Sequence, residues 1–255
     1  MRFTKVRLLE NREPFIFICG DSYAADYSSQ DGWVEFLRKD LGKQYHVANY
    51  AGKGLSPMLS TFVVRDYARE LAKSNDLLIF ILPDTMRFNL QIIPEDKQAL
   101  SATTPNASKK HLSYLKNTIG RQNLRFLFDF HKHYTFYHQN RSEEVMKYLS
   151  YLYLIGKKYF KKTLIIPTTP FPKTVDTGLF DNLDNFYLSN FFLDDVSIDE
   201  GEAFKKVMKL HGEDDRTNHL CYENRVILKD QIKEWIFNNK IPTKDLFKTN
   251  VDNNE

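Results

Sequence analysis

The chain has 255 residues, 42% of them hydrophobic and 27% charged, and its formal net charge is +3. This composition predicts a globular protein with a substantial core, and the charge is too small to indicate a nucleic-acid partner. No segment approaches the roughly 18 apolar residues that span a bilayer, so we expect no membrane partner. Residues 1–13 lack the apolar segment of a signal peptide, and the two cysteines are too few for a disulfide framework. We therefore expect a cytoplasmic protein.

Four short apolar segments have the length and boundaries of β-strands. They are residues 15–19, 45–49, 77–82 and 163–167. The first is a run of five apolar residues between Pro14 and Gly20. It contains Cys19, which we interpret as a small buried hydrophobic residue rather than a nucleophile.

Four amphipathic segments with helical spacing alternate with these strands. They are residues 33–41, 59–72, 143–161 and 222–238, and Ser56-Pro57 marks the start of the second as its cap and first turn. Alternating strands and helices predict one α/β domain over residues 1–240. Its centre would be a parallel sheet of about five strands with helices on both faces.

Residues 91–140 interrupt this alternation, and we interpret them as an insertion or lid after the third strand. The segment is first polar and then rich in Phe, Tyr and His. Its histidines, His131, His133 and His138, raise the alternative of a metal site, but no acidic or cysteine residue completes an evident ligand set. We therefore expect neither a metal nor another cofactor. Residues 241–255 are expected to form a polar tail.

The tripeptide Gly20-Asp21-Ser22 directly follows the first predicted strand. An ordinary turn, with Asp21 as a helix cap, is the simpler interpretation of so short a motif. However, the carboxyl edge of a parallel sheet is where open α/β folds collect their reacting groups. Serine hydrolysis also needs a histidine base, an acid and oxyanion donors. His219 precedes the last predicted helix, and a glycine-rich loop from Asn49 to Ser56 follows the second strand.

In order and spacing these segments resemble the sequence blocks of the SGNH, or GDSL, hydrolases. Gly20-Asp21-Ser22 matches the block of the nucleophile. Asn49, with Gly54 five positions later, is similar to the block whose glycine donates an oxyanion N–H. Asn218-His219-Leu220 looks like the last block, whose histidine is the general base. The resemblance implies a three-layer, flavodoxin-like fold and a serine esterase or deacetylase acting on a small acyl ester, with carbohydrate esters among the candidate substrates.

The sequence departs from that family at two positions. In the third block the family has an oxyanion-binding asparagine, whereas this chain has Asp84-Thr85-Met86-Arg87. An ionised Asp84 would repel an oxyanion, and Thr85 or Arg87 could donate to it instead. The family acid normally lies three residues before the histidine, where this chain has Arg216. Asp215 and Asp214 are the remaining candidates for the acid.

These departures leave two alternatives to the esterase. One is a binding protein that keeps the fold but turns over no substrate. The other is an O-acyltransferase, in which an acceptor hydroxyl replaces water in the second half of the reaction.

Overall fold

The centre of the fold is a parallel sheet of five strands. The computed structural model describes residues 13–24, 32–52, 55–85, 89–90, 100–101, 141–197 and 220–248. The strands are β1 (Phe15–Cys19), β2 (His46–Asn49), β3 (Leu77–Leu82), β6 (Lys162–Pro167) and β7 (Phe186–Leu188). Their order is β2-β1-β3-β6-β7, and all neighbouring pairs are parallel. Counted along the chain, this is the 2-1-3-4-5 order of flavodoxin-like folds, which confirms the predicted fold class.

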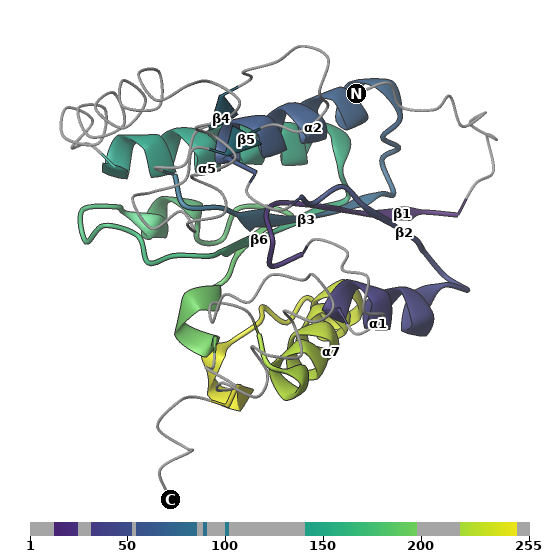
Figure 1. The fold of residues 1–255 in the computed structure, drawn as a ribbon. Helices are drawn as coiled ribbons and strands as arrows, with labels where there is room; N and C mark the ends of the chain where they lie inside the picture. The colour runs from purple at the N-terminus through teal and green to yellow at the C-terminus, as the bar shows by residue number, and fades with distance from the viewer. Residues whose placement is uncertain are drawn as a thin grey trace, which may run out of the picture.

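Helices cover both faces of the sheet and make the molecule three layers deep (Figure 1). The helices α2 (Pro57–Glu70) and α5 (Arg141–Tyr159) lie over one face. The helices α1 (Trp33–Leu41) and α7 (Tyr222–Asn238) lie over the other. Parallel strands need such crossover connections, and right-handed crossovers in both directions from a central strand place helices on both faces.

Strand side chains point alternately into the two helical layers. Ile79 and Ile81 pack in the cluster that contains α1 and α7, whereas Leu78 and Phe80 pack in the cluster that contains α2 and α5. All six residues of β3 are buried because this strand lies at the centre of the sheet between the two layers. Burial on both faces explains why its sequence is continuously apolar.

The buried carboxylate of Asp76 connects three segments at the amino-terminal edge of the sheet. It has no exposed surface. Its oxygens accept hydrogen bonds from the backbone N–H groups of Phe15 (2.9 Å) and Lys73 (2.9 Å) and from the Tyr67 hydroxyl (3.2 Å). Asp76 thereby joins β1, the turn before β3 and α2.

Asn224, in the first turn of α7, forms hydrogen bonds with the segment that follows this helix. Its buried amide donates to the carbonyls of Val196 (2.7 Å) and Lys248 (2.9 Å) and accepts from the Lys248 N–H (2.9 Å). Phe247 is buried, with its ring centroid 5.1 Å from that of Phe191. Phe247 thus holds the described first part of the predicted polar tail against the core, and residues 249–255 of that tail lie outside the described residues.

The predicted helices and strands agree with the structure, with shifts of one or two residues at the ends of β2, α2, α5 and β6. The exception is β7, which the sequence analysis missed. This strand has only three residues, and Asn182 and Asn185 before it adopt positive φ angles of 58° and 60°. Two further strands, β4 (Asn89–Leu90) and β5 (Leu100–Ser101), form a separate antiparallel pair. The rest of the predicted insertion over 91–140 lies outside the described residues.

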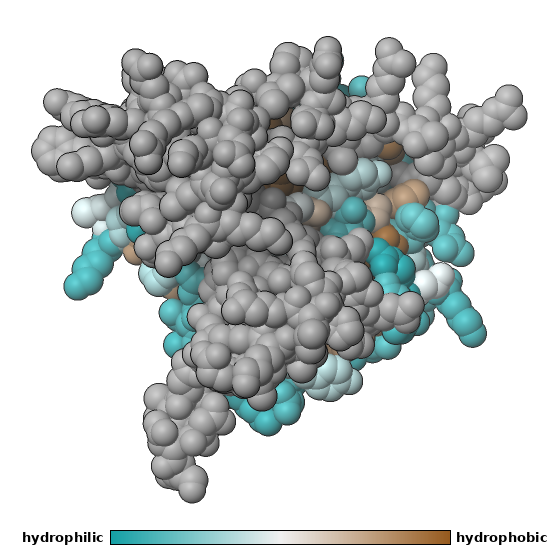
Figure 2. Space-filling model, in the orientation of Figure 1, coloured by the Kyte–Doolittle hydropathy of each residue, from teal (hydrophilic) through white to brown (hydrophobic). Residues whose placement is uncertain are grey.

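Among the described side chains, those at the outer edge of the molecule are mostly hydrophilic (Figure 2). Large exposed hydrophobic residues do occur, for example Leu154 and Leu246. Within the described part of the chain, no helix combines the length and the apolar composition needed to cross a bilayer.

Candidate functional site at the carboxyl edge of the sheet

The strand order reverses between β1 and β3, and two of the predicted site residues, Ser22 and Asp84, follow these strands. From β1 the chain continues to β2 on one side, and from β3 it continues to β6 on the other. Open α/β folds bind their ligands beyond the carboxyl ends of the strands at such a reversal. Ser22 lies just after β1 and Asp84 just after β3, and the register pairs Cys19 with Phe80. The two predicted residues therefore follow neighbouring strands at the same edge.

The turn from Gly20 to Ala24 holds Ser22 in one place. Gly20 has a φ of +148°, and a Cβ there would lie 2.4 Å from the carbonyl oxygen of Ile81 on β3. Only glycine allows both this backbone angle and this approach. The Asp21 carboxylate accepts from the Tyr23 N–H (3.1 Å), and the Asp21 carbonyl accepts from the Ala24 N–H (3.1 Å). Neither Asp21 nor Ser22 has exposed surface.

Asn49, at the end of β2, connects the loops that follow β1 and β2. Its amide donates to the Ala24 carbonyl (2.6 Å), and its side-chain oxygen accepts from the Ala51 N–H (3.0 Å). The Gly52 N–H adds a hydrogen bond to the Gly20 carbonyl (3.1 Å). Asn49 thus positions the serine turn. Gly54, the predicted oxyanion donor of this loop, lies outside the described residues.

An arginine that the sequence analysis missed pairs with Asp84. Arg141, the first described residue of α5, places its Nη2 3.4 Å from Asp84 Oδ1 and donates from the same nitrogen to Thr169 Oγ1 (3.1 Å). The negative charge of Asp84 at this edge is thus partly balanced by Arg141. Thr85 is buried, and its hydroxyl has no hydrogen-bond partner among the described residues. The sequence offered one indication of Arg141: it is a cation at the start of a helix, where the helix dipole favours an anion instead.

Two titratable groups beside the turn are held in their protonated forms. Burial raises the pKa of the Cys19 thiol to about 12, and the thiol contacts the Ser60 carbonyl (3.3 Å). Cys19 therefore behaves as a small hydrophobic residue, as the sequence suggested. The Tyr23 hydroxyl donates to Asp194 (2.5 Å). Burial, reinforced by the charge of Asp194, raises the pKa of Tyr23 above its ordinary value. Tyr23 links the serine turn to the 3-10 helix η2 (Leu193–Val196).

Several predicted site residues lie outside the described residues, so their geometry stays a prediction. They are Gly54, Arg87, Asp214, Asp215, Asn218 and His219. The histidines of the alternative metal site, His131, His133 and His138, also lie outside. Among the residues that are described, no three His, Cys, Asp or Glu side chains form a group able to hold a metal ion.

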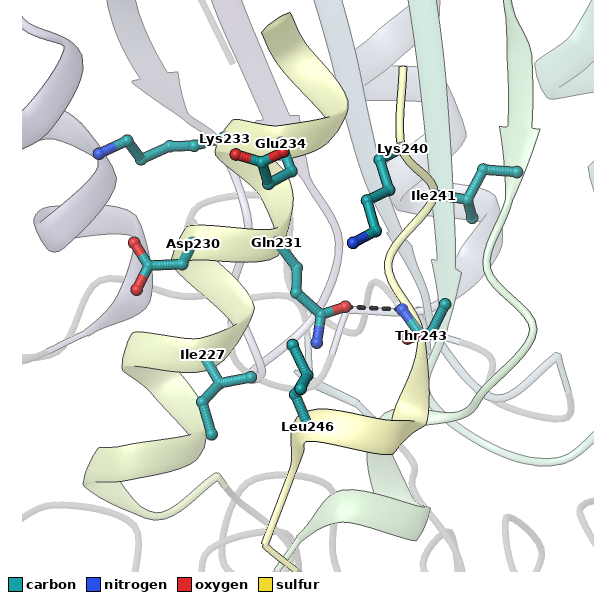
Figure 3. A pocket seen from close by; sticks show the side chains of 9 residues that line it. All are labelled: Ile227, Asp230, Gln231, Lys233, Glu234, Lys240, Ile241, Thr243 and Leu246. Carbon is teal, nitrogen blue, oxygen red and sulfur yellow. Dashed lines mark hydrogen bonds between the residues drawn. The ribbon is translucent and has the colours of Figure 1, made fainter. Parts of the chain in front are cut away.

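A hollow of about 390 Å³ lies away from this edge, between α7 and the segment that follows it (Figure 3). Ile227, Ile241 and Leu246 give it apolar walls, and Lys233 and Lys240 are among its charged residues. Gln231 accepts a hydrogen bond from the Thr243 N–H (2.6 Å), drawn as the dashed line in Figure 3. The predicted site residues that the structure describes, Ser22, Asp84 and Thr85, do not line this hollow.

The fold and the residues at the carboxyl edge of the sheet define a flavodoxin-like α/β protein with a buried serine turn where the strand order reverses. No protein-family model matches the chain, and no curated protein matches its sequence. Among solved structures, the chain is similar to a member of the lipolytic protein G-D-S-L family from Veillonella parvula DSM 2008. The identity is 10% and the TM-score 0.43, over 89% of this chain and 99% of that one.

Proposed function

We propose that this protein is a serine esterase or deacetylase that hydrolyses a small acyl ester, with carbohydrate esters among the candidate substrates. The observation that carries the proposal is the position of Ser22. It lies on a turn fixed by Gly20 and Asp21, immediately beyond β1 at the strand-order reversal. A hydroxyl fixed at this edge, beside the start of the glycine-rich loop after β2, suits attack on an acyl carbon.

In the proposed reaction, the Ser22 oxygen adds to the carbonyl carbon while His219 accepts its proton. Asp215, or Asp214 as second choice, orients the histidine. The backbone N–H groups of Ser22 and Gly54 bind the oxyanion. The alcohol leaves with the proton from His219, which produces an acyl-enzyme and a neutral histidine. Water then adds to the acyl group while His219 accepts its proton, and the acid leaves as His219 returns that proton to the Ser22 oxygen.

Two features favour slow turnover. Ser22 has no exposed surface, so the side chains that cover it must move before a substrate reaches it. In addition, Asp84 replaces a neutral amide donor, and removing one oxyanion donor typically lowers the rate by about 10²–10³-fold. We therefore expect weak hydrolysis of short activated esters such as p-nitrophenyl acetate. An O-acyltransferase would use the same acyl-enzyme, and adding an acceptor alcohol would then divert the product from acid to ester.

The proposal is tested by labelling with an organophosphonate and by ester hydrolysis in Ser22→Ala. The matched control is Ser189→Ala, which removes another buried serine hydroxyl beyond the carboxyl end of a strand of the same sheet. We expect the label on Ser22, hydrolysis lost in Ser22→Ala, and hydrolysis retained in Ser189→Ala. Unlabelled Ser22, together with hydrolysis that survives Ser22→Ala, would favour the non-catalytic binding protein, which the burial of Ser22 also fits.

The acid is tested separately by Asp215→Asn and Asp214→Asn. Replacement of the true partner of His219 should lower turnover by a factor on the order of 10⁴. Equal and mild losses in both variants would show that neither carboxylate has this role.

A further inference from the structure

Arg141 connects the loops that follow β3 and β6 into one polar group, here called the edge cluster. It consists of Asp84, Thr85, Arg141, Thr168 and Thr169. The Nη2 atom of Arg141 contacts Asp84 on the first loop and Thr169 on the second. The Thr168 N–H donates to the carbonyl of Leu82 (2.9 Å), which keeps the two loops side by side.

Three atoms of the edge cluster are buried without a hydrogen-bond partner among the described residues. They are Thr85 Oγ1, Thr168 Oγ1 and Arg141 Nε. Thr85 is 9% exposed and Thr168 only 1%. Buried polar atoms in folded proteins nearly always have a partner, because leaving them without one is unfavourable. Three such atoms, two on adjoining loops and one on the arginine of α5 that contacts both loops, indicate a place where a ligand supplies the missing hydrogen bonds.

The chemistry of these atoms indicates which ligand group fits. Each of the three can donate a hydrogen bond, and Arg141 adds a permanent positive charge. Both hydrogen bonds that Arg141 makes to described residues come from Nη2, which leaves Nε and Nη1 to donate elsewhere. Several donors beside a guanidinium suit a group with more than one acceptor oxygen, because a cationic donor forms its strongest hydrogen bonds with anionic oxygens and carboxylates and phosphates carry several of them. Asp84 and Thr169 both contact Nη2, so the group would accept from Nε and from the two threonine hydroxyls.

We propose that the edge cluster binds an anionic group with several oxygens, a carboxylate or a phosphate, carried by the molecule that the Ser22 site takes. The assignment as part of a substrate site rests on the proposed function. Asp84 and Thr85 follow β3, which neighbours β1, and Thr168 and Thr169 follow β6, the next strand along. The edge cluster therefore lies at the same edge of the sheet as Ser22. The enzyme would then select acyl esters that carry a negative charge on the acyl or the alcohol part.

The first experiment measures binding without catalysis. Inorganic phosphate and succinate are titrated calorimetrically into the full chain at constant ionic strength, and their relative affinities distinguish phosphate from carboxylate ligands. Arg141→Gln should weaken binding by roughly ten- to a hundredfold, the effect of losing charged hydrogen bonds. Arg65→Gln is the matched control, because Arg65 is also a partly exposed helical arginine paired with an aspartate. Equal affinities in wild type and Arg141→Gln would overturn the proposal.

A second pair of variants separates binding from folding. Thr85→Val and Thr168→Val remove hydroxyls that have no partner among the described residues, so the free protein should be as stable as wild type or more so. Anion affinity should nevertheless fall several-fold in each. Variants that lose stability while binding the anions normally would show that the hydroxyls serve the fold, and the proposal would fail. These variants also decide the question if Arg141→Gln does not fold.

The last experiment compares p-nitrophenyl esters whose acyl chains end in a carboxylate or, at equal length, in a methyl group. The ratio of kcat/KM for the charged over the neutral ester should fall at least tenfold in Arg141→Gln and stay unchanged in Arg65→Gln. Ester hydrolysis without charge preference and without anion binding would overturn the edge cluster but leave the esterase intact. Anion binding that depends on Arg141, with no hydrolysis of either ester, would overturn the esterase but leave the edge cluster intact.

Discussion

Replacing Gly20 by alanine tests whether the serine turn depends on one backbone position. Gly20 has a φ of +148°, and an added Cβ would lie 2.4 Å from the carbonyl oxygen and 2.6 Å from the Cβ of Ile81. The backbone angle alone costs a non-glycine residue about 1–3 kcal/mol. Overpacking against a core strand adds about 1–3 kcal/mol, because the backbone of β3 cannot move without disturbing both helical layers.

We therefore expect Gly20→Ala to lower the free energy of unfolding by about 2–6 kcal/mol, a large share of the 5–15 kcal/mol typical of a domain. Urea unfolding followed by circular dichroism measures this loss. Gly32→Ala is the control, because nothing lies within 4 Å of a Cβ there. Gly32 precedes α1 as its N-cap with an ordinary extended backbone, so alanine should cost at most about 1 kcal/mol.

Equal, small losses in the two glycine variants would refute the argument, because they would mean that β3 and the serine turn do not meet as closely as described. A folded Gly20→Ala protein would also report on function. Since relief of the clash must shift the turn, the labelling of Ser22 by an organophosphonate should slow even at temperatures where the variant stays native.

Three further outcomes follow from buried groups. Burial raises the pKa of Cys19 to about 12 in the folded chain, whereas the ordinary value in the unfolded chain is 9.0. Between these pH values only the unfolded chain loses the proton, so the free energy of unfolding should fall by about 1.4 kcal/mol per pH unit. In urea unfolding from pH 8 to 11, Cys19→Ala should show a shallower decline. Asp76→Ala leaves buried donors without an acceptor and should cost about 3 kcal/mol or more in unfolding free energy at pH 7, whereas Asp66→Ala, at a partly exposed ion pair, should cost under about 1 kcal/mol. Asn224→Ala should lower the thermal midpoint markedly, while Asn238→Ala, which loses one exposed contact to Glu234, should leave it nearly unchanged.

The sequence could predict the fold because the central strands are buried on both faces. Such strands are continuous apolar runs with sharp ends, as in β1 between Pro14 and Gly20. The strand β7 has no such signal, since only Phe186 of its three residues is fully buried. The strand forms because the chain after β6 returns alongside it, and the three residues themselves do not indicate this path. The packing of Phe247 was equally hidden, because a single aromatic residue in a polar segment does not reveal which core residue it contacts.

The site could be predicted only where its residues adjoin predicted strands. Ser22 and Asp84 follow apolar runs, so their positions at one edge follow from the parallel sheet. The partner of Asp84 did not follow, because Arg141 is 57 positions further along the chain and helical periodicity placed the start of α5 two residues too late. An ion pair across that separation depends on the three-dimensional fold. The roles of His219 and of its acid remain predictions.

The energetics of the Asp84–Arg141 pair favour a role in the site over a role in stability. The two side chains are 23% and 35% exposed, and pairs this accessible to water contribute roughly 0–1 kcal/mol. A cation at the start of a helix opposes the helix dipole at a cost of about 0.3–1 kcal/mol. Because the two effects are of similar size, the fold gains almost nothing from Arg141. Arg141→Gln should therefore change the free energy of unfolding by less than about 1 kcal/mol, while anion binding at the edge weakens by roughly ten- to a hundredfold. If instead stability and binding fall together, the pair serves the fold.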